Sequence, residues 1–190
     1  MFRDLTFTDV HRAEALDARA GFVMDEDTFR AFYDRTARGV WAYLARVTGD
    51  RQLADDLLQE AFYRFLRADA EHDNESHRRN SLYRIATNLA RDARRRSLIR
   101  APFNLSCSNI ELVPSTDRHA TAAGTEFAQA MSHLKPRERA MLWLAYAEGA
   151  SHREIAEVLG LRPGSLKPML FRARKRLAAL LGRAPEKDKE

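Results

Sequence analysis

The chain has 190 residues, enough for one ordinary domain or two small ones. Its 45% hydrophobic and 31% charged residues are typical of a globular protein in water, and the formal net charge is only +5 at pH 7. The single cysteine, Cys107, excludes an intramolecular disulfide and a paired-cysteine metal site, and the six histidines show no ligand spacing. Neither a signal-peptide core nor a run of membrane-spanning length is found, so we expect a cytoplasmic protein with no metal and no cofactor.

The first predicted helices follow from apolar residues that recur at helical spacing. One apolar stripe runs from Asp27 to Gly49, and a second follows Asp50, which can cap a helix. The hydrophilic stretch 69–76 predicts a loop, and the helix after it continues into the basic run 91–96. The expected core positions are Phe29, Tyr33, Val40, Leu44, Val47, Leu53, Leu57, Ala61, Phe65, Leu82, Ile85 and Leu89. Three such helices can enclose one small core.

Between residues 101 and 124 the helical periodicity disappears, and Pro102, Pro114 and scattered serines and threonines indicate a linker. Order returns at Thr125, with an apolar face expected from Phe127, Ala130, Met131 and Leu134. Pro136 then opens another helix, at a position where proline is tolerated. The expected organisation is all-α, with a first helical domain at 25–100 and a second at 125–182, joined by a linker at 101–124. An N-terminal extension at 1–24 and a charged tail at 183–190 flank the two domains.

The end of the second domain has the pattern of a helix-turn-helix. Gly149 fits a helix C-terminus, and Ser151 with Glu154 forms a capping box that starts a short helix. Gly160 ends this helix, and the next one has an apolar stripe at Leu166, Leu170, Ala173, Leu177 and Leu181. In DNA-binding proteins of this pattern the second helix enters the major groove. A packed helical hairpin without a DNA role is the alternative interpretation.

The charges fall into three zones. Residues 50–75 contain eight acids and three arginines, a net charge of −5. Residues 78–100 contain eight arginines and one acid, a net charge of +7, and residues 162–183 contain seven bases and no acid. Two basic helices separated by a linker indicate two contacts with a polyanion, and duplex DNA is the natural candidate.

The acidic zone requires a different partner. Asp56, Gln59, Glu60 and Tyr63 stand at i, i+3, i+4 and i+7, so they share one helix face, and Asp55 flanks it. These carboxylates would repel phosphate, which favours a basic protein surface as the partner. An ordinary solvated helix face is the other interpretation.

Three segments also carry a resemblance to a known family. They are 50–62 (DRQLADDLLQEAF), 81–96 (SLYRIATNLARDARRR), and 134–161 leading into 171–177 (FRARKRL). In this order and spacing they resemble the extracytoplasmic-function (ECF) sigma factors, the smallest class of bacterial sigma factors. The three segments are similar, in turn, to the part that binds core polymerase, the part that reads and opens the minus-ten promoter element, and the domain that reads the minus-thirty-five element. The resemblance covers about residues 25–181.

This resemblance implies a role for each segment. The polymerase contacts would be made to the clamp helices of the beta-prime subunit, with the beta subunit as a further contact, by Asp55, Asp56, Gln59 and Glu60. The loop 69–80 would hold a flipped base of the non-template strand. At the minus-ten element the implied DNA contacts are Arg78, Arg79, Asn80, Tyr83, Arg84, Asn88, Arg91 and Arg95. At the minus-thirty-five element they are Arg153, Ser165, Lys167, Met169, Arg172 and Lys175. An anti-sigma factor is a further implied partner.

Several positions depart from the family's pattern, with Ser81 and Pro168 among them. Ser81 stands where tryptophan is usual, so stacking on the duplex edge is expected to be weaker or supplied by Tyr83. Pro168 lies in the reading helix and would cost roughly 3 kcal/mol deep inside it. We therefore predict a late helix start, capped by Ser165, which places Pro168 in the first turn. A start at Pro163 with a kink near Pro168 is the alternative.

The expected function is that of a sigma factor, which binds core RNA polymerase and directs promoter-specific initiation under anti-sigma control. No enzymatic activity is expected, because no catalytic constellation has a supporting context. A plain helix-turn-helix regulator leaves the acidic face and the first basic helix unexplained. A sigma-like decoy, which titrates an anti-sigma factor and never starts transcription, is compatible with the departures at Ser81 and Pro168. Transcription with core polymerase separates these alternatives.

Overall fold

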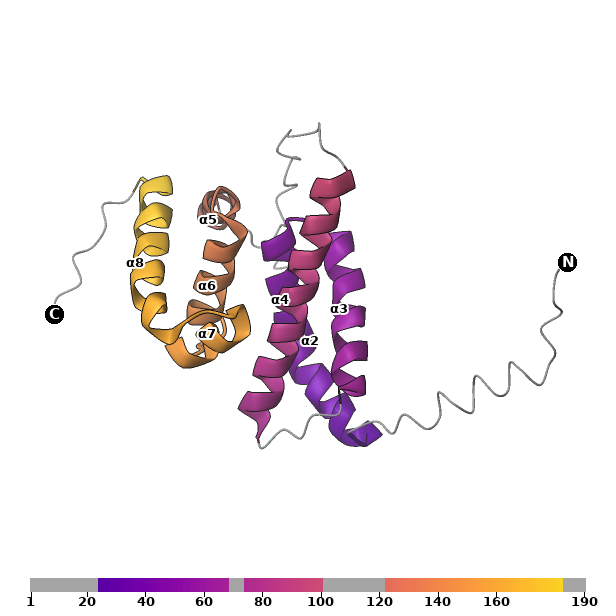
Figure 1. The fold of residues 1–190 in the computed structure, drawn as a ribbon. Helices are drawn as coiled ribbons and strands as arrows, with labels where there is room; N and C mark the ends of the chain where they lie inside the picture. Colours follow the sequence, from indigo (N-terminus) through magenta and orange to yellow (C-terminus); the bar gives the residue numbers. More distant parts are fainter. Residues whose placement is uncertain (1–23, 69–73, 101–121, 183–190) are drawn as a thin grey trace, which may run out of the picture.

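The computed structural model describes residues 24–68, 74–100 and 122–182, and every regular element in these ranges is an α-helix. Helices α2 (Glu26–Thr48), α3 (Arg51–Arg67) and α4 (Glu75–Arg100) form one group. Helices α5 (Ala122–Ser132), α6 (Pro136–Tyr146), α7 (His152–Leu159) and α8 (Pro163–Leu180) form a second. The two groups lie side by side in Figure 1, indigo to magenta beside orange to yellow. The predicted all-α fold is confirmed, whereas most of the predicted linker lies outside the described residues.

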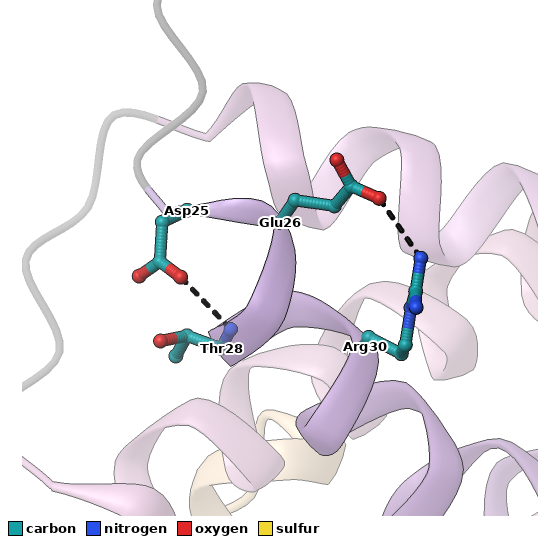
Figure 2. Close-up of polar contacts among 4 residues, drawn as sticks. All are labelled: Asp25, Glu26, Thr28 and Arg30. Carbon is teal, nitrogen blue, oxygen red and sulfur yellow. Dashed lines mark hydrogen bonds and ion pairs between the residues drawn. The ribbon is translucent and has the colours of Figure 1, made fainter.

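Helix α2 is capped at its N-terminus by Asp25 and at its C-terminus by Gly49. At its start the side chain of Asp25 accepts a 2.9 Å hydrogen bond from the Thr28 backbone N–H, and Glu26 pairs with Arg30 at 2.9 Å (Figure 2). At its end Gly49 adopts φ 77°, a left-handed conformation that glycine reaches without steric cost. The predicted end at Gly49 is thus confirmed.

The core of the first group differs in detail from the predicted apolar stripe. Phe32 and Tyr43 are fully buried, and the Phe32 ring stacks on Phe65 with 5.1 Å between centroids. The predicted Tyr33 is instead 40% exposed, and its ring lies against Phe62 at the rim of the core. The expectation that Tyr33 belongs to the core was wrong because Phe32 occupies the contact with Phe65, whereas Val40 and Leu44 of the predicted stripe are fully buried.

Helices α3 and α4 begin at side-chain caps. Asp50 accepts a 3.0 Å hydrogen bond from the Leu53 N–H, as predicted. Asn74 accepts one of 2.9 Å from the His77 N–H, so α4 begins at Glu75, inside the stretch predicted to be a loop. The predicted loop is therefore too long, because residues 75–80 are helical. Residues 69–73 lie outside the described part of the chain.

The second group contains the predicted helix-turn-helix, formed by α7 and α8. Pro136 is the first residue of α6, and Ser151 with Glu154 forms the capping box of α7, both as predicted. Gly160 ends α7 with φ 63°. One predicted core residue, Phe127, is 44% exposed on α5, whereas Ala130, Met131 and Leu134 are buried.

The predicted late start of α8 was wrong. The helix begins at Pro163, and Pro168 lies inside it. Proline at the first position already has a helical φ and needs no donor, so Pro163 is a suitable start. Pro168 and Gly164 are both exposed, so water can solvate the Gly164 carbonyl that Pro168 leaves without a donor. With this start Leu166 lies near the beginning of α8, and its side chain is completely buried.

The two helical groups share one hydrophobic core and several polar contacts. Helix α7 packs on α4, and α6 packs on α2. The buried Arg139 donates a 2.9 Å hydrogen bond from Nη1 to the Arg46 carbonyl of α2. Arg91 of α4 donates a 2.6 Å hydrogen bond to the carbonyl of Leu159, the last residue of α7. The second group therefore covers part of α4.

Candidate nucleic-acid interface

Helix α3 presents the acidic face predicted from its sequence. Asp56 and Gln59 are exposed, and Glu60 is half-buried. Glu60 forms a 2.6 Å ion pair with Arg64, one turn further along the helix. Asp55 is turned toward α2, where its carboxylate accepts a 2.6 Å hydrogen bond from the Trp41 indole N–H. The carboxylate most available to a partner on this face is thus that of Asp56.

Tyr63 completes this face and adds an apolar surface to it. Its ring is 50% exposed, and Arg67 lies 5.5 Å from the ring centroid and donates a 2.6 Å hydrogen bond to the hydroxyl. An aromatic ring beside carboxylates suits a partner that brings both basic and apolar side chains.

The predicted minus-ten residues divide between two faces of α4. Arg84, Asn88 and Arg95 are exposed and stand at i, i+4 and i+11, so they share the outward face. Arg78 and Arg79 are half-buried near the start of the helix. This exposed arginine-rich face can contact phosphates in the arrangement observed here.

The other predicted minus-ten residues face α7 or lie in the core. Asn80 is buried and donates a 3.2 Å hydrogen bond to Glu154. Tyr83 is only 2% exposed, and its ring packs edge-on against Tyr43 with centroids 5.3 Å apart. The pKa of the Tyr83 hydroxyl is raised by burial, by the charge of Glu148 and by its hydrogen bond with that carboxylate. Stacking of Tyr83 on DNA would require this environment to open.

The predicted minus-thirty-five residues lie on the solvent side of the helix-turn-helix. Ser165, Lys167, Arg172 and Lys175 are exposed on α8, and Arg153 is exposed on α7. Met169 is half-buried. At 3.6 residues per turn Lys167 and Met169 lie about 160° apart, on opposite edges of the exposed face, whereas Lys175 is near its centre.

Sequence reasoning missed the residues that join the two helical groups. Arg46 and Arg139 meet across 93 positions of the chain, and Glu148 bonds to Trp143 at 3.1 Å and also to Tyr83. No periodic signal in the sequence marks such pairs, because their partners lie in another helical group. In the described ranges we find no cluster of three or more side chains suited to bind a metal ion. Nor does any helix in those ranges have the length and apolarity needed to cross a membrane.

Comparison with known proteins shows the class to which this fold and these charged faces belong. Residues 32–98 match the family described as sigma-70 region 2, and residues 125–177 match sigma-70 region 4. The ECF RNA polymerase sigma factor SigL of Mycobacterium tuberculosis is 31% identical over 147 residues, which cover 76% of this chain and 83% of SigL. The chain belongs to the ECF RNA polymerase sigma factors.

A further relative agrees with this assignment, and two solved structures have a similar fold. BldN of Streptomyces coelicolor, also an ECF RNA polymerase sigma factor, is 26% identical over 185 residues, which cover 90% of this chain and 70% of BldN. Among solved structures, the sigma factor RpoE in complex with the anti-sigma factor NepR from Bartonella quintana superposes with a TM-score of 0.71 at 19% identity, over 85% of this chain and 98% of that one. CnrH in complex with the cytosolic domain of CnrY superposes with a TM-score of 0.59 at 23% identity, over 90% of this chain and 96% of that one.

Proposed function

We propose that this sigma factor joins core RNA polymerase through the acidic face of α3 and directs it to promoters through α4 and α8. One observation carries the proposal: a single chain exposes an acidic helix face and two basic helix faces on separate helices. A protein that only bound DNA would have no use for the acidic face. The chain acts by binding rather than by catalysis, in the cytoplasm where polymerase meets the chromosome.

The polymerase contact rests on Asp56 and Gln59, with Glu60 and Asp55 at the edges of the same surface. Asp56 and Gln59 are exposed and one turn apart, so both can contact one basic helix at the same time. Asp55 already accepts the Trp41 hydrogen bond and contributes mainly negative potential. Electrostatic attraction of this kind increases the association rate and fixes the register of the partner.

The DNA contacts rest on two groups of basic side chains. On α4, Arg84 and Arg95 would bind phosphates, with Asn88 between them on the same face. On α8, Lys175 and Arg172 would contact the duplex near the minus-thirty-five element, with Lys167 at the edge. Most of the affinity would come from phosphates and would fall as salt rises.

For all the predicted minus-ten residues of α4 to contact DNA, α7 must move away from α4. Asn80 and Tyr83 are buried, and Arg91 is bonded to the Leu159 carbonyl. We infer that the packed arrangement belongs to the protein without polymerase, and that binding to polymerase separates the two helical groups. An anti-sigma factor is a partner for the packed form, since the structurally similar sigma factor RpoE was crystallised with the anti-sigma factor NepR.

A sigma-like decoy is the second candidate. Pro168 lies inside α8, where it cannot donate a backbone hydrogen bond, and Tyr83 is buried where stacking on DNA was expected. A decoy would keep the family's fold and its anti-sigma partner while lacking promoter recognition.

Mobility-shift measurements on fragmented genomic DNA test the proposal. The chain alone should shift DNA weakly and without preference, and the chain with core polymerase should retain a small set of fragments. Specific retention by the chain alone would identify a plain DNA-binding regulator. No retention by the mixture, although the chain binds polymerase, would favour the decoy.

A further inference from the structure

A cavity of about 440 Å³ lies between the two helical groups. Its wall is formed by α2, α4, the start of α6 and the end of α7, through Tyr43, Val47, Thr87, Arg91, Arg94, Lys135, Pro136, Arg137, Ala140, Leu159 and Gly160. A volume of this size falls within the range of small-molecule sites in proteins. Because both groups supply its wall, the cavity exists only while they are packed together.

The residues that line this cavity include four basic residues and no acidic residue. Arg91 and Arg94 come from α4, and Lys135 and Arg137 come from the start of α6. At the N-terminal end of α6 the Lys135 backbone N–H already donates a 2.9 Å hydrogen bond to the Glu138 carboxylate, so the basic side chains supply the positive charge of the wall. Basic side chains from two helices therefore line one partly open space, and no carboxylate is among the residues of its wall.

A second observation points to the same unbalanced charge. Arg139 is 8% exposed, and its Nε has no hydrogen-bond partner among the described residues. Burial lowers the pKa of Arg139, and the positive charge of Arg94 lowers it further. Like charges thus oppose one another across the contact between the groups, and an anion placed among them would relieve that repulsion.

The wall also has an apolar part. Val47, Pro136 and Ala140 line the cavity together with the bases. A ligand that carries phosphates on an apolar ring would satisfy both parts, with the phosphates bound by arginine, which holds phosphate oxygens in a bidentate fork.

We propose that this cavity binds a small phosphate-bearing molecule of nucleotide size, which bridges α4 and α6 and holds the two helical groups together. The proposal goes beyond the proposed function, in which Arg94, Lys135 and Arg137 have no part. A bound ligand would regulate promoter binding, because it would keep α7 packed over α4 and would keep Arg91 away from promoter DNA.

Calorimetric titration of the full chain with inorganic pyrophosphate, and then with ADP, tests the site at about 0.15 M ionic strength. We expect one saturable site for each probe and none for adenosine. Arg94→Ala and Arg137→Ala should each weaken binding about tenfold or more, since each removes a charge-assisted hydrogen bond. Both side chains are exposed, so the variants should keep the helical circular-dichroism spectrum of the parent chain.

The matched control is Arg96→Ala, which removes an exposed arginine of the same helix that does not line the cavity. Its affinity for pyrophosphate should equal that of the parent chain. An equal loss in Arg96→Ala and Arg94→Ala would overturn the proposal in favour of general attraction to a basic helix. Absence of saturable binding would also overturn it. So would equally tight binding of a short polyglutamate peptide, which would assign the cavity to an acidic protein segment.

Discussion

Asn80 and Glu154 lie 74 positions apart in the chain, and the side-chain amide of Asn80 donates a 3.2 Å hydrogen bond to Oε1 of Glu154. The other oxygen, Oε2, accepts a 2.8 Å hydrogen bond from the Ser151 backbone N–H at the start of α7. One carboxylate therefore caps the first helix of the helix-turn-helix and also ties that helix to α4.

The pKa of Glu154 provides a pH test of this contact. Hydrogen bonds from Ser151, chiefly, and then the Asn80 bond and the charge of Arg79 lower this pKa below its ordinary value of 4.5. A carboxyl with a lowered folded-state pKa stabilises the fold above the unfolded-state value, and this contribution is lost as pH falls through the folded-state pKa. Glu154→Gln should therefore lower the free energy of unfolding at pH 7 by about 1 kcal/mol or less, because a neutral amide bonds more weakly than a carboxylate.

Urea denaturation at several pH values from 7 downward measures this difference. It should shrink as the pH falls below 4.5, the ordinary value for this carboxyl. Glu157→Gln changes an exposed acid of the same helix and should show a small difference throughout. A Glu154→Gln difference that stayed constant with pH would argue against the Asn80 and Ser151 bonds as its cause.

Charge reversal on α3 tests the polymerase contact. The double change Asp56→Arg and Glu60→Arg should lower affinity for core polymerase at least about a hundredfold, because it replaces attraction by repulsion at a close interface. Asp34→Arg reverses an exposed acid on α2 outside this face and should bind as the parent chain does. Equilibrium binding to immobilised core polymerase gives the comparison. If the double variant bound normally, another surface would have to hold polymerase.

The orientation of α8 on DNA can be tested through salt dependence. Lys175 is exposed near the centre of the helix face that points away from the core. Lys175→Ala should reduce the magnitude of the log–log slope of DNA affinity against salt by about 0.9, the value of one phosphate contact. Arg176→Ala is the control, because Arg176 is directed to Glu138 of α6 at 3.8 Å. Equal slopes for Lys175→Ala and the parent chain would show that α8 is docked on DNA in a different orientation.

Removal of Pro168 should stabilise the protein. Within a continuous helix this proline leaves the Gly164 carbonyl without its donor, and a proline ring is expected to crowd the carbonyl four residues before it. Pro168→Ala restores the donor and should raise the free energy of unfolding by up to about 3 kcal/mol. The gain is reduced by the greater freedom of the unfolded chain. Unchanged or lower stability in urea denaturation would show that the first turns of α8 accommodate proline without strain.

The local features of the fold could be predicted from the sequence because they depend on neighbouring residues. Asp50 and Ser151 cap helices as expected, and Gly49 and Gly160 end them in the left-handed conformation. Pro136 opens α6 for the same local reason. The three charged faces likewise follow from helical spacing alone.

Features that depend on packing between distant segments were beyond such reasoning. Tyr33 fits the helical period of α2 but is displaced from the core because Phe32 occupies the contact with Phe65. The predicted start of α8 was wrong because the capping preference of Ser165 is a local property, whereas the complete burial of Leu166 depends on packing against other helices. The covering of α4 by α7 involves Asn80 and Glu154, whose separation in the chain leaves no periodic trace.

Transcription in vitro tests the central claim most directly. Core polymerase from the source organism would be incubated with fragmented genomic DNA, with and without the chain, and the 5′ ends of the transcripts would be sequenced. A sigma factor should add discrete start sites that share sequence elements about ten and thirty-five base pairs upstream, and the Asp56→Arg, Glu60→Arg double variant should add none. Binding of the chain to polymerase without any new start sites would contradict the account and identify a sigma-like decoy.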